Sequence, residues 1–214
     1  MKIQSLQVLV ERLIERGFVF ETRASRTLRS GRDEIIEVGD TTQLSAVVPV
    51  PENSTNYYLE VIRQSKFSWL LFDASLIQIW YKRRGAEIIA HRYCYIPCPF
   101  ETDLRVETDS PYSDLIEVSC TQNPYDQARR TILRFEYEPL AASPNHPAAH
   151  LHLNANNCRI PMKSGFSVRE FIYFILRFFY SETFDASALA IPQFNARGTL
   201  TGDDEQTFHL NWRI

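Results

Sequence analysis

The sequence predicts an α+β fold in which an antiparallel β-meander packs on a buried aromatic helix. Two features indicate the meander: apolar runs separated by short turns, and longer segments in which apolar and polar residues alternate. A third feature indicates the helix, because residues 167–180 are apolar around most of the circumference and begin with a capping box, Ser167 and Glu170. With 214 residues, the chain is long enough for one sizeable core, so we expect a single α+β domain over 1–214.

The N-terminal residues 2–16 carry apolar side chains at helical spacing, with charged residues on the remaining side. This pattern predicts an amphipathic helix that ends at Gly17, and a strand is expected to start at residues 18–20. The next segment has an arginine at every third position, namely Arg23, Arg26, Arg29 and Arg32. Such a segment favours either a nucleic-acid-binding arm or a solvated loop whose charge is diluted by the acidic residues that follow it.

The middle of the chain supplies the meander. Ser54 or Thr55 is placed to cap a short helix that runs to about residue 64. The other predicted elements of the chain are strands at 35–38, 44–50, 67–72, 76–81, 86–96, 115–120, 129–138 and 208–212, with loops at 101–113 and 184–205. A tight connection at 73–75 and a turn at 82–85 join three of these strands in sequence, which is typical of an antiparallel meander.

Composition and charge limit the classes of function. The formal net charge is −3, so no global basic field exists to drive non-specific binding of nucleic acid. The N-terminus lacks the uninterrupted apolar core of a signal peptide, and the most apolar run, 171–180, contains Arg177 and is too short to cross a bilayer. The four cysteines form no paired CxxC motif. We therefore expect a cytoplasmic protein without a membrane partner.

The segment from Ser143 to Tyr180 concentrates the chemistry, since it holds three of the five histidines, His146, His150 and His152. In a strand, His150 and His152 project from one face while Leu151 and Leu153 project from the other. Residues 154–157 read as a turn, after which the chain can return beside the first strand and bring Arg159 near the histidines. The pattern predicts a pair of imidazoles beside a guanidinium.

Three segments also carry a resemblance to a known family: WLLFDASLIQIWY, HRYCYIPCPF and SPNHPAAHLHLNANNCRIPMKSGFSVREFIYFILRFFY. Together they resemble the bacterial family catalogued as domain of unknown function 2290, over residues 10–180. The resemblance implies a small, bacterial, stand-alone protein and suggests a mobile or defence-related gene context. It assigns no catalytic residue.

The residues favour general acid–base catalysis by histidine. Two imidazoles that titrate near neutral pH can transfer protons to and from a phosphodiester, and a guanidinium can hold the phosphate. The expected catalytic residues are His91, His150, His152 and Arg159, and the expected substrate contacts are Arg92, His146 and Asn154. RNA suits this set best, because its 2′-hydroxyl can act as the nucleophile without a metal. The activity would suit a toxin or a phage-defence effector.

Two other interpretations of the histidines remain. A strand H-x-H pair can share a metal ion, but Asn154 to Asn157 stand where cupin-like proteins have a glutamate, and zinc signatures are absent. We therefore expect no metal or cofactor; a third ligand would have to come from His91, His146 or a distant acid. Alternatively, the histidines are structural and Arg159 pairs with Glu136 or another carboxylate of the sheet.

The alternative function is a non-catalytic subunit of a defence or toxin–antitoxin complex, which binds an operon-encoded protein. It follows from the lack of a complete catalytic motif and from aromatic residues of the kind that interfaces favour. Those aromatic residues are Tyr57, Tyr58, Trp80, Tyr81, Tyr93 and Tyr125. Cys94 and Cys98 have no activating base nearby and are expected to be inert packing residues.

Overall fold

A computed structural model describes residues 3–39, 54–100, 102–105, 112–122, 131–153, 158–183, 198–202 and 209–210. These residues form a nine-stranded antiparallel sheet, with β1 (Val19–Thr22), β2 (Ser25–Ser30), β3 (Asp33–Val38), β4 (Trp69–Leu71), β5 (Leu76–Arg84), β6 (Glu87–Ile96), β7 (Leu133–Tyr137), β8 (Ala149–Leu153) and β9 (Ile160–Pro161). The strand order is β1-β4-β5-β6-β7-β8-β9. The hairpin of β2 and β3 joins the sheet through β3, which pairs with β5 beyond the end of β4.

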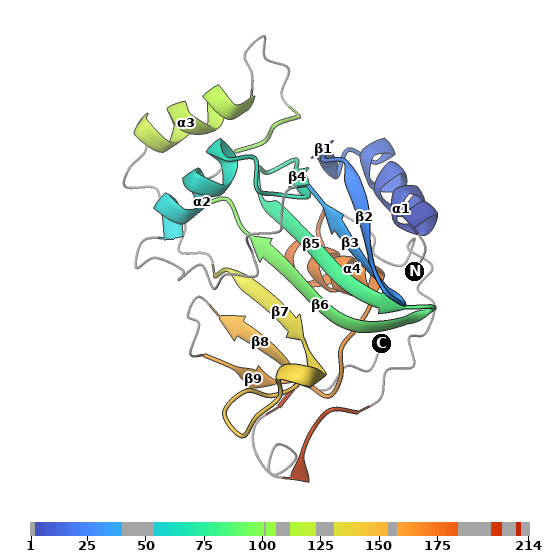
Figure 1. Ribbon diagram of the computed structural model, residues 1–214. Helices are drawn as coiled ribbons and strands as arrows, with labels where there is room; N and C mark the ends of the chain where they lie inside the picture. The colour runs from blue at the N-terminus through green and yellow to red at the C-terminus, as the bar shows by residue number, and fades with distance from the viewer. Residues whose placement is uncertain are drawn as a thin grey trace.

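Helices cover both faces of this sheet (Figure 1). α1 (Ile3–Glu15) and α4 (Val168–Phe179) bury their apolar side chains against one face and form the larger core. α2 (Ser54–Arg63) and α3 (Tyr112–Gln122) contribute to a second, smaller core on the other face. The α+β class, the N-terminal helix and the aromatic helix predicted from the sequence are therefore confirmed.

The larger core is built around α4. Its predicted capping box is present, since the Ser167 hydroxyl accepts from the Glu170 amide and the Glu170 carboxylate accepts from the Ser167 amide. Phe171 is fully buried and stacks on Tyr93 of β6 with ring centroids 5.3 Å apart. Burial of one such aromatic side chain stabilises the fold by about 1.5–3 kcal/mol. The helix thereby fixes which face of β6 and β7 points into the larger core.

The second core occupies one end of the opposite face. Cys94 and Ile96 of β6 pack there with residues of α2 and α3. Burial raises the pKa of Cys94 to about 12, and Cys98 is also buried, as expected for packing residues. Farther along the same face, toward β7 and β8, the side chains become charged: Arg92, Arg134 and Glu136 succeed the apolar residues. The second core thus gives way to a polar cluster.

Two sequence predictions were wrong. Residues 115–120 lie within helix α3 rather than a strand, although their β-branched side chains favour a strand. The arginine-rich segment, predicted to be an arm or a loop, is strand β2, whose residues are all exposed and paired to β3. Arg26 and Arg29 bind Glu37 and Glu34 of β3, so acidic partners offset the charge of this segment. The predicted strand 44–50 and turn 154–157 lie outside the described residues, as does most of 184–205.

Among the described residues, no helix has the length and apolar character needed to cross a membrane.

Candidate functional site

The register of three strands brings the candidate site together. Arg92 of β6 lies directly opposite Glu136 of β7, and Glu136 lies directly opposite His150 of β8. Arg134 pairs in the same way with His152. Directly paired residues share a face of the sheet, so these five side chains gather on the face that holds the second core. We call them the Glu136 cluster.

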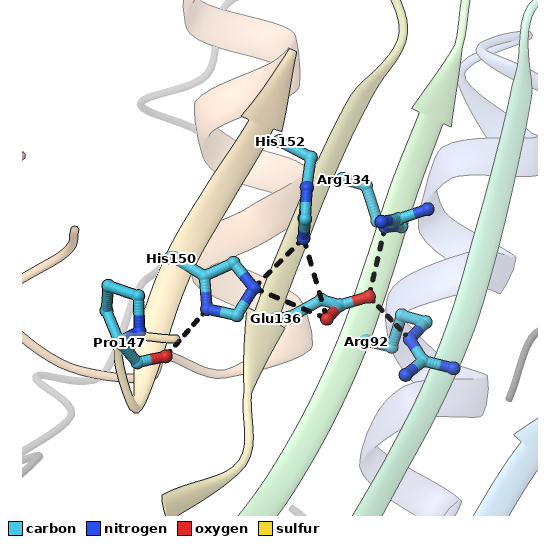
Figure 2. A network of polar contacts seen from close by, with 6 residues as sticks. All are labelled: Arg92, Arg134, Glu136, Pro147, His150 and His152. Carbon is cyan, nitrogen blue, oxygen red and sulfur yellow. Dashed lines mark hydrogen bonds and ion pairs between the residues drawn. The ribbon is translucent and has the colours of Figure 1, made fainter. Parts of the chain in front are cut away.

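The carboxylate of Glu136 is the centre of the cluster, between two arginines and two histidines (Figure 2). Its Oε1 atom lies 2.9 Å from Nε of Arg92 and 3.0 Å from Nε of Arg134. Its Oε2 atom lies 3.4 Å from Nε2 of His150 and 3.7 Å from Nε2 of His152. Oε1 therefore contacts the two guanidiniums, and Oε2 contacts the two imidazoles.

The hydrogen bonds of His150 define its tautomer. Nδ1 of His150 lies 2.7 Å from the backbone oxygen of Pro147, and because a carbonyl oxygen can only accept, Nδ1 carries a hydrogen. In the neutral ring, Nε2 then has a free lone pair. Nε2 of His152 lies 2.9 Å away and must donate in that state. Both histidines are buried, with 0% and 3% of their surface exposed.

His146 and Arg159 extend the site toward solvent. The ring of His146 meets that of His150 edge to face, with centroids 4.7 Å apart, and it is partly exposed. Arg159 precedes Ile160, the partner of Leu151, so the register places it beside His152, as the sequence predicted. Nδ1 of His146 and Nε of Arg159 are both buried without a hydrogen-bond partner within the described part of the chain.

The electrostatics follow from burial and from these contacts. Burial alone would raise the pKa of Glu136, but its contacts with His150 and His152 and the charges of the two arginines hold it below the ordinary value. Burial lowers the pKa of His152 despite its contact with Glu136. Burial, together with the neighbouring His150 and Arg159, also lowers the pKa of His146. The carboxylate is therefore charged and His146 and His152 are neutral at pH 7.

His91, a predicted catalytic residue, does not join the site. It pairs with Tyr137 and lies on the opposite face, stacked on Tyr93 with centroids 4.3 Å apart. Its Nε2 accepts a hydrogen bond from the backbone amide of Phe166 at 3.1 Å. Burial lowers the pKa of His91 to about 3, so the ring is a neutral part of the larger core. Its neighbour Arg92 points the other way and belongs to the cluster.

The other predictions divide into three groups. The structure brings together His150, His152, Arg92, His146 and Arg159, all of which were singled out in the sequence. Asn154 lies outside the described residues. Glu136 and Arg134 were missed as site residues. Their signal was a pair of charged residues alternating with Leu133, Phe135 and Tyr137, which places both charges on one face of a single strand.

Comparison with known proteins agrees with the resemblance noted in the sequence. Residues 19–212 match the family described as "Uncharacterized conserved protein (DUF2290)". The chain belongs to this family. No curated protein and no solved structure matches it. The family description states no activity. Function is therefore inferred from the geometry of the Glu136 cluster and of its neighbours His146 and Arg159.

Proposed function

We propose that this protein cleaves RNA at a site formed by His146 and Arg159 beside the Glu136 cluster. The observation that carries the proposal is the pair of buried nitrogens, Nδ1 of His146 and Nε of Arg159, that have no hydrogen-bond partner within the described residues. Leaving buried polar atoms unpaired costs about 1–3 kcal/mol each. A phosphodiester oxygen would supply an acceptor for the guanidinium and bring a 2′-hydroxyl near the imidazole.

His146 suits proton transfer better than the buried pair. It is partly exposed, and its lowered pKa keeps the ring neutral at pH 7, the state that can accept a proton. His150 and His152 were the acid and base expected from the sequence, but their burial keeps them from contact with a polynucleotide in this conformation. In the proposed site they support the catalytic group rather than act on substrate.

The proposed reaction uses the nucleophile that RNA itself carries. His146 accepts the proton of the 2′-hydroxyl, the 2′-oxygen attacks phosphorus, and the bond from phosphorus to the 5′-oxygen breaks. The 5′-oxygen leaves as a hydroxyl after it takes a proton from the protonated imidazole. The products are a 2′,3′-cyclic phosphate and a 5′-hydroxyl. Arg159 would hold the phosphate and stabilise the charge that develops on its oxygens.

The test compares three substrates of one sequence: RNA, DNA and 2′-O-methyl RNA. We expect the wild-type protein to cut only RNA and to leave cyclic phosphate ends, identified by mass spectrometry. His146→Ala should lower the rate by about 10²–10⁴. Arg159→Met should weaken cleavage as well, whereas Arg29→Met, which removes an exposed arginine of β2, should not. Cleavage of DNA, or full activity in His146→Ala, would refute the mechanism.

The biological role proposed for this activity is that of a toxin or phage-defence effector. Induction of the wild-type gene should then arrest growth, and induction of His146→Ala at the same protein level should not. Arrest by both proteins would separate toxicity from RNA cleavage.

The second candidate, a subunit that binds an operon-encoded protein, is favoured by a different observation. Phe178 and Phe179 at the end of α4 are 63% and 45% exposed. Four of the aromatic residues that the sequence predicts for this role are instead buried, namely Tyr57, Tyr58, Tyr81 and Tyr93, and Tyr125 lies outside the described residues. Co-expression with the neighbouring gene product tests this candidate: Phe178→Ser should abolish co-purification, while Leu140→Ser, at another exposed apolar residue, should not.

A further inference from the structure

Three potential metal-ligand atoms converge in the Glu136 cluster. Nε2 of His150 and Nε2 of His152 are 2.9 Å apart, and they lie 3.4 and 3.7 Å from Oε2 of Glu136. A tetrahedral ion with bonds of about 2.0–2.1 Å holds its ligand atoms about 3.3–3.4 Å from one another. The three observed separations lie on both sides of this value. They form a triangle of the size that one ion requires.

The orientation of His150 matches that of a metal ligand. Histidines that bind a metal through one ring nitrogen commonly donate from the other to a backbone carbonyl or a carboxylate. His150 makes this contact through Nδ1 and the Pro147 oxygen at 2.7 Å, which directs the lone pair of Nε2 toward His152 and Glu136. In the neutral ring this lone pair faces a carboxylate oxygen at 3.4 Å, and a cation between the two atoms would turn a repulsive contact into an attractive one.

The two arginines leave the ligand position open. Both bind Oε1 of Glu136, on the side of the carboxylate away from the imidazoles. Oε2 is left facing the histidines, so Glu136 can coordinate through one oxygen. The guanidinium charges oppose a nearby dication and are expected to weaken its affinity, but they do not occupy its place.

We propose that Glu136, His150 and His152 bind one divalent transition-metal ion, of which zinc fits best. Two imidazole nitrogens and one carboxylate oxygen suit zinc and its first-row neighbours rather than magnesium or calcium, which prefer oxygen ligands alone. Three protein ligands leave a fourth position for water or a substrate oxygen, as in catalytic zinc sites. The sequence offered only the two histidines; the third ligand comes from β7, the strand that precedes β8 in the chain and pairs with it. The metal site is independent of the proposed RNA cleavage.

The test measures metal directly, without RNA. Full-length protein that carries no polyhistidine tag is dialysed against EDTA, then against zinc chloride, and its zinc content is determined by mass spectrometry. We expect about one ion per chain. With cobalt(II) in place of zinc, the visible absorption of a tetrahedral site should appear. Wild-type protein that retains no zinc and shows no cobalt absorption would overturn the proposal.

Variants locate the ion. His152→Ala should weaken zinc binding by more than the roughly 10- to 100-fold that loss of an outer hydrogen-bond partner costs. His146→Ala, the matched control, should retain zinc because His146 does not belong to the group of converging ligand atoms. Equal zinc loss from both variants, or from neither, would overturn the assignment. If His152→Ala fails to fold, the wild type still decides, since a bound ion raises its melting temperature. Zinc binding without RNA cleavage refutes the proposed function alone, and RNA cleavage by wild-type protein that fails to bind zinc refutes the metal site alone.

Discussion

His91 offers a direct test of the assignment of the two sheet faces. Its imidazole is buried in the larger core, accepts a hydrogen bond from the Phe166 amide at 3.1 Å and stacks on Tyr93. Burial lowers its pKa from the ordinary 6.5 to about 3. The folded state therefore keeps this ring neutral at pH values where the unfolded chain protonates it. The contribution of the neutral ring to the free energy of unfolding is complete above pH 6.5, and it is lost as the pH falls from 6.5 toward 3.

The size of the effect follows from linkage. Each pH unit between the two pKa values costs about 1.4 kcal/mol. Between pH 7 and pH 5, titration of His91 alone should lower the free energy of unfolding by about 2 kcal/mol. His146 and His152, whose pKa values are also lowered, act in the same direction. The test must therefore compare how the free energy of unfolding changes with pH in the variants and in the wild type, because the wild-type change alone includes the other histidines.

Two replacements isolate His91. His91→Phe keeps a ring against Tyr93, and His91→Gln keeps an acceptor for the Phe166 amide. Urea denaturation at pH 7, 6 and 5 gives the free energy of unfolding of each protein. Both variants should be less stable than wild type at pH 7, yet both should lose about 2 kcal/mol less between pH 7 and pH 5. If the free energy of unfolding depends on pH equally in all three proteins, His91 titrates in the folded state, and the assignment of a buried neutral ring is refuted.

Three further predictions concern other parts of the fold. Gly165→Ala places a Cβ atom 2.6 Å from Cγ of Tyr137, and this overlap should lower the free energy of unfolding, measured in urea, by about 1–3 kcal/mol. Glu136→Ala removes the carboxylate that both arginines of the cluster bind, so a loss of about 3–5 kcal/mol is expected in the same assay. Cys94 is buried with its pKa raised to about 12, whereas Cys158 is partly exposed, so iodoacetamide should label Cys158 first in native protein, as peptide mass spectrometry can show.

The sequence predicted the elements that have a strong periodic or capping signal. Helix α4 has a capping box and an apolar circumference, and β8 follows from the alternation of His150 and His152 with leucines. Strand β2 has no such signal, because all of its side chains are exposed and it is held by pairing and ion pairs to β3. Helix α3 was hidden by the β-branched residues in its sequence, and its contact with α2 on the second core is a tertiary effect.

The candidate site was predicted in part, for reasons that concern the sheet. The H-x-H pattern and the return of Arg159 depend on local geometry, and both appear in β8 and β9. The face on which His91 lies cannot be predicted from local geometry. Strand β6 contributes apolar side chains to both cores, so alternation alone cannot tell its two faces apart. Glu136 required the register between β7 and β8, which their connecting residues do not reveal.

The Glu136 cluster occupies positions where apolar side chains would extend the second core. A buried ionic network is weak support for stability, and its replacement by apolar residues of similar volume is often neutral or stabilising. We therefore expect the triple variant Arg92→Met, Arg134→Met, Glu136→Leu to unfold within about 1 kcal/mol of the wild type or to be more stable. It should lose zinc binding and RNA cleavage.

Urea denaturation, with Glu136→Ala as the control, decides between two roles for the cluster. The triple variant also removes the two partly buried arginine charges that remain in Glu136→Ala, so it should recover most of the stability which that single change loses. Recovery of stability without recovery of function would mean that these polar residues are retained for binding and chemistry. A triple variant as unstable as Glu136→Ala would show instead that the cluster holds β6, β7 and β8 in register, and a structural role would then be enough to account for its polar residues.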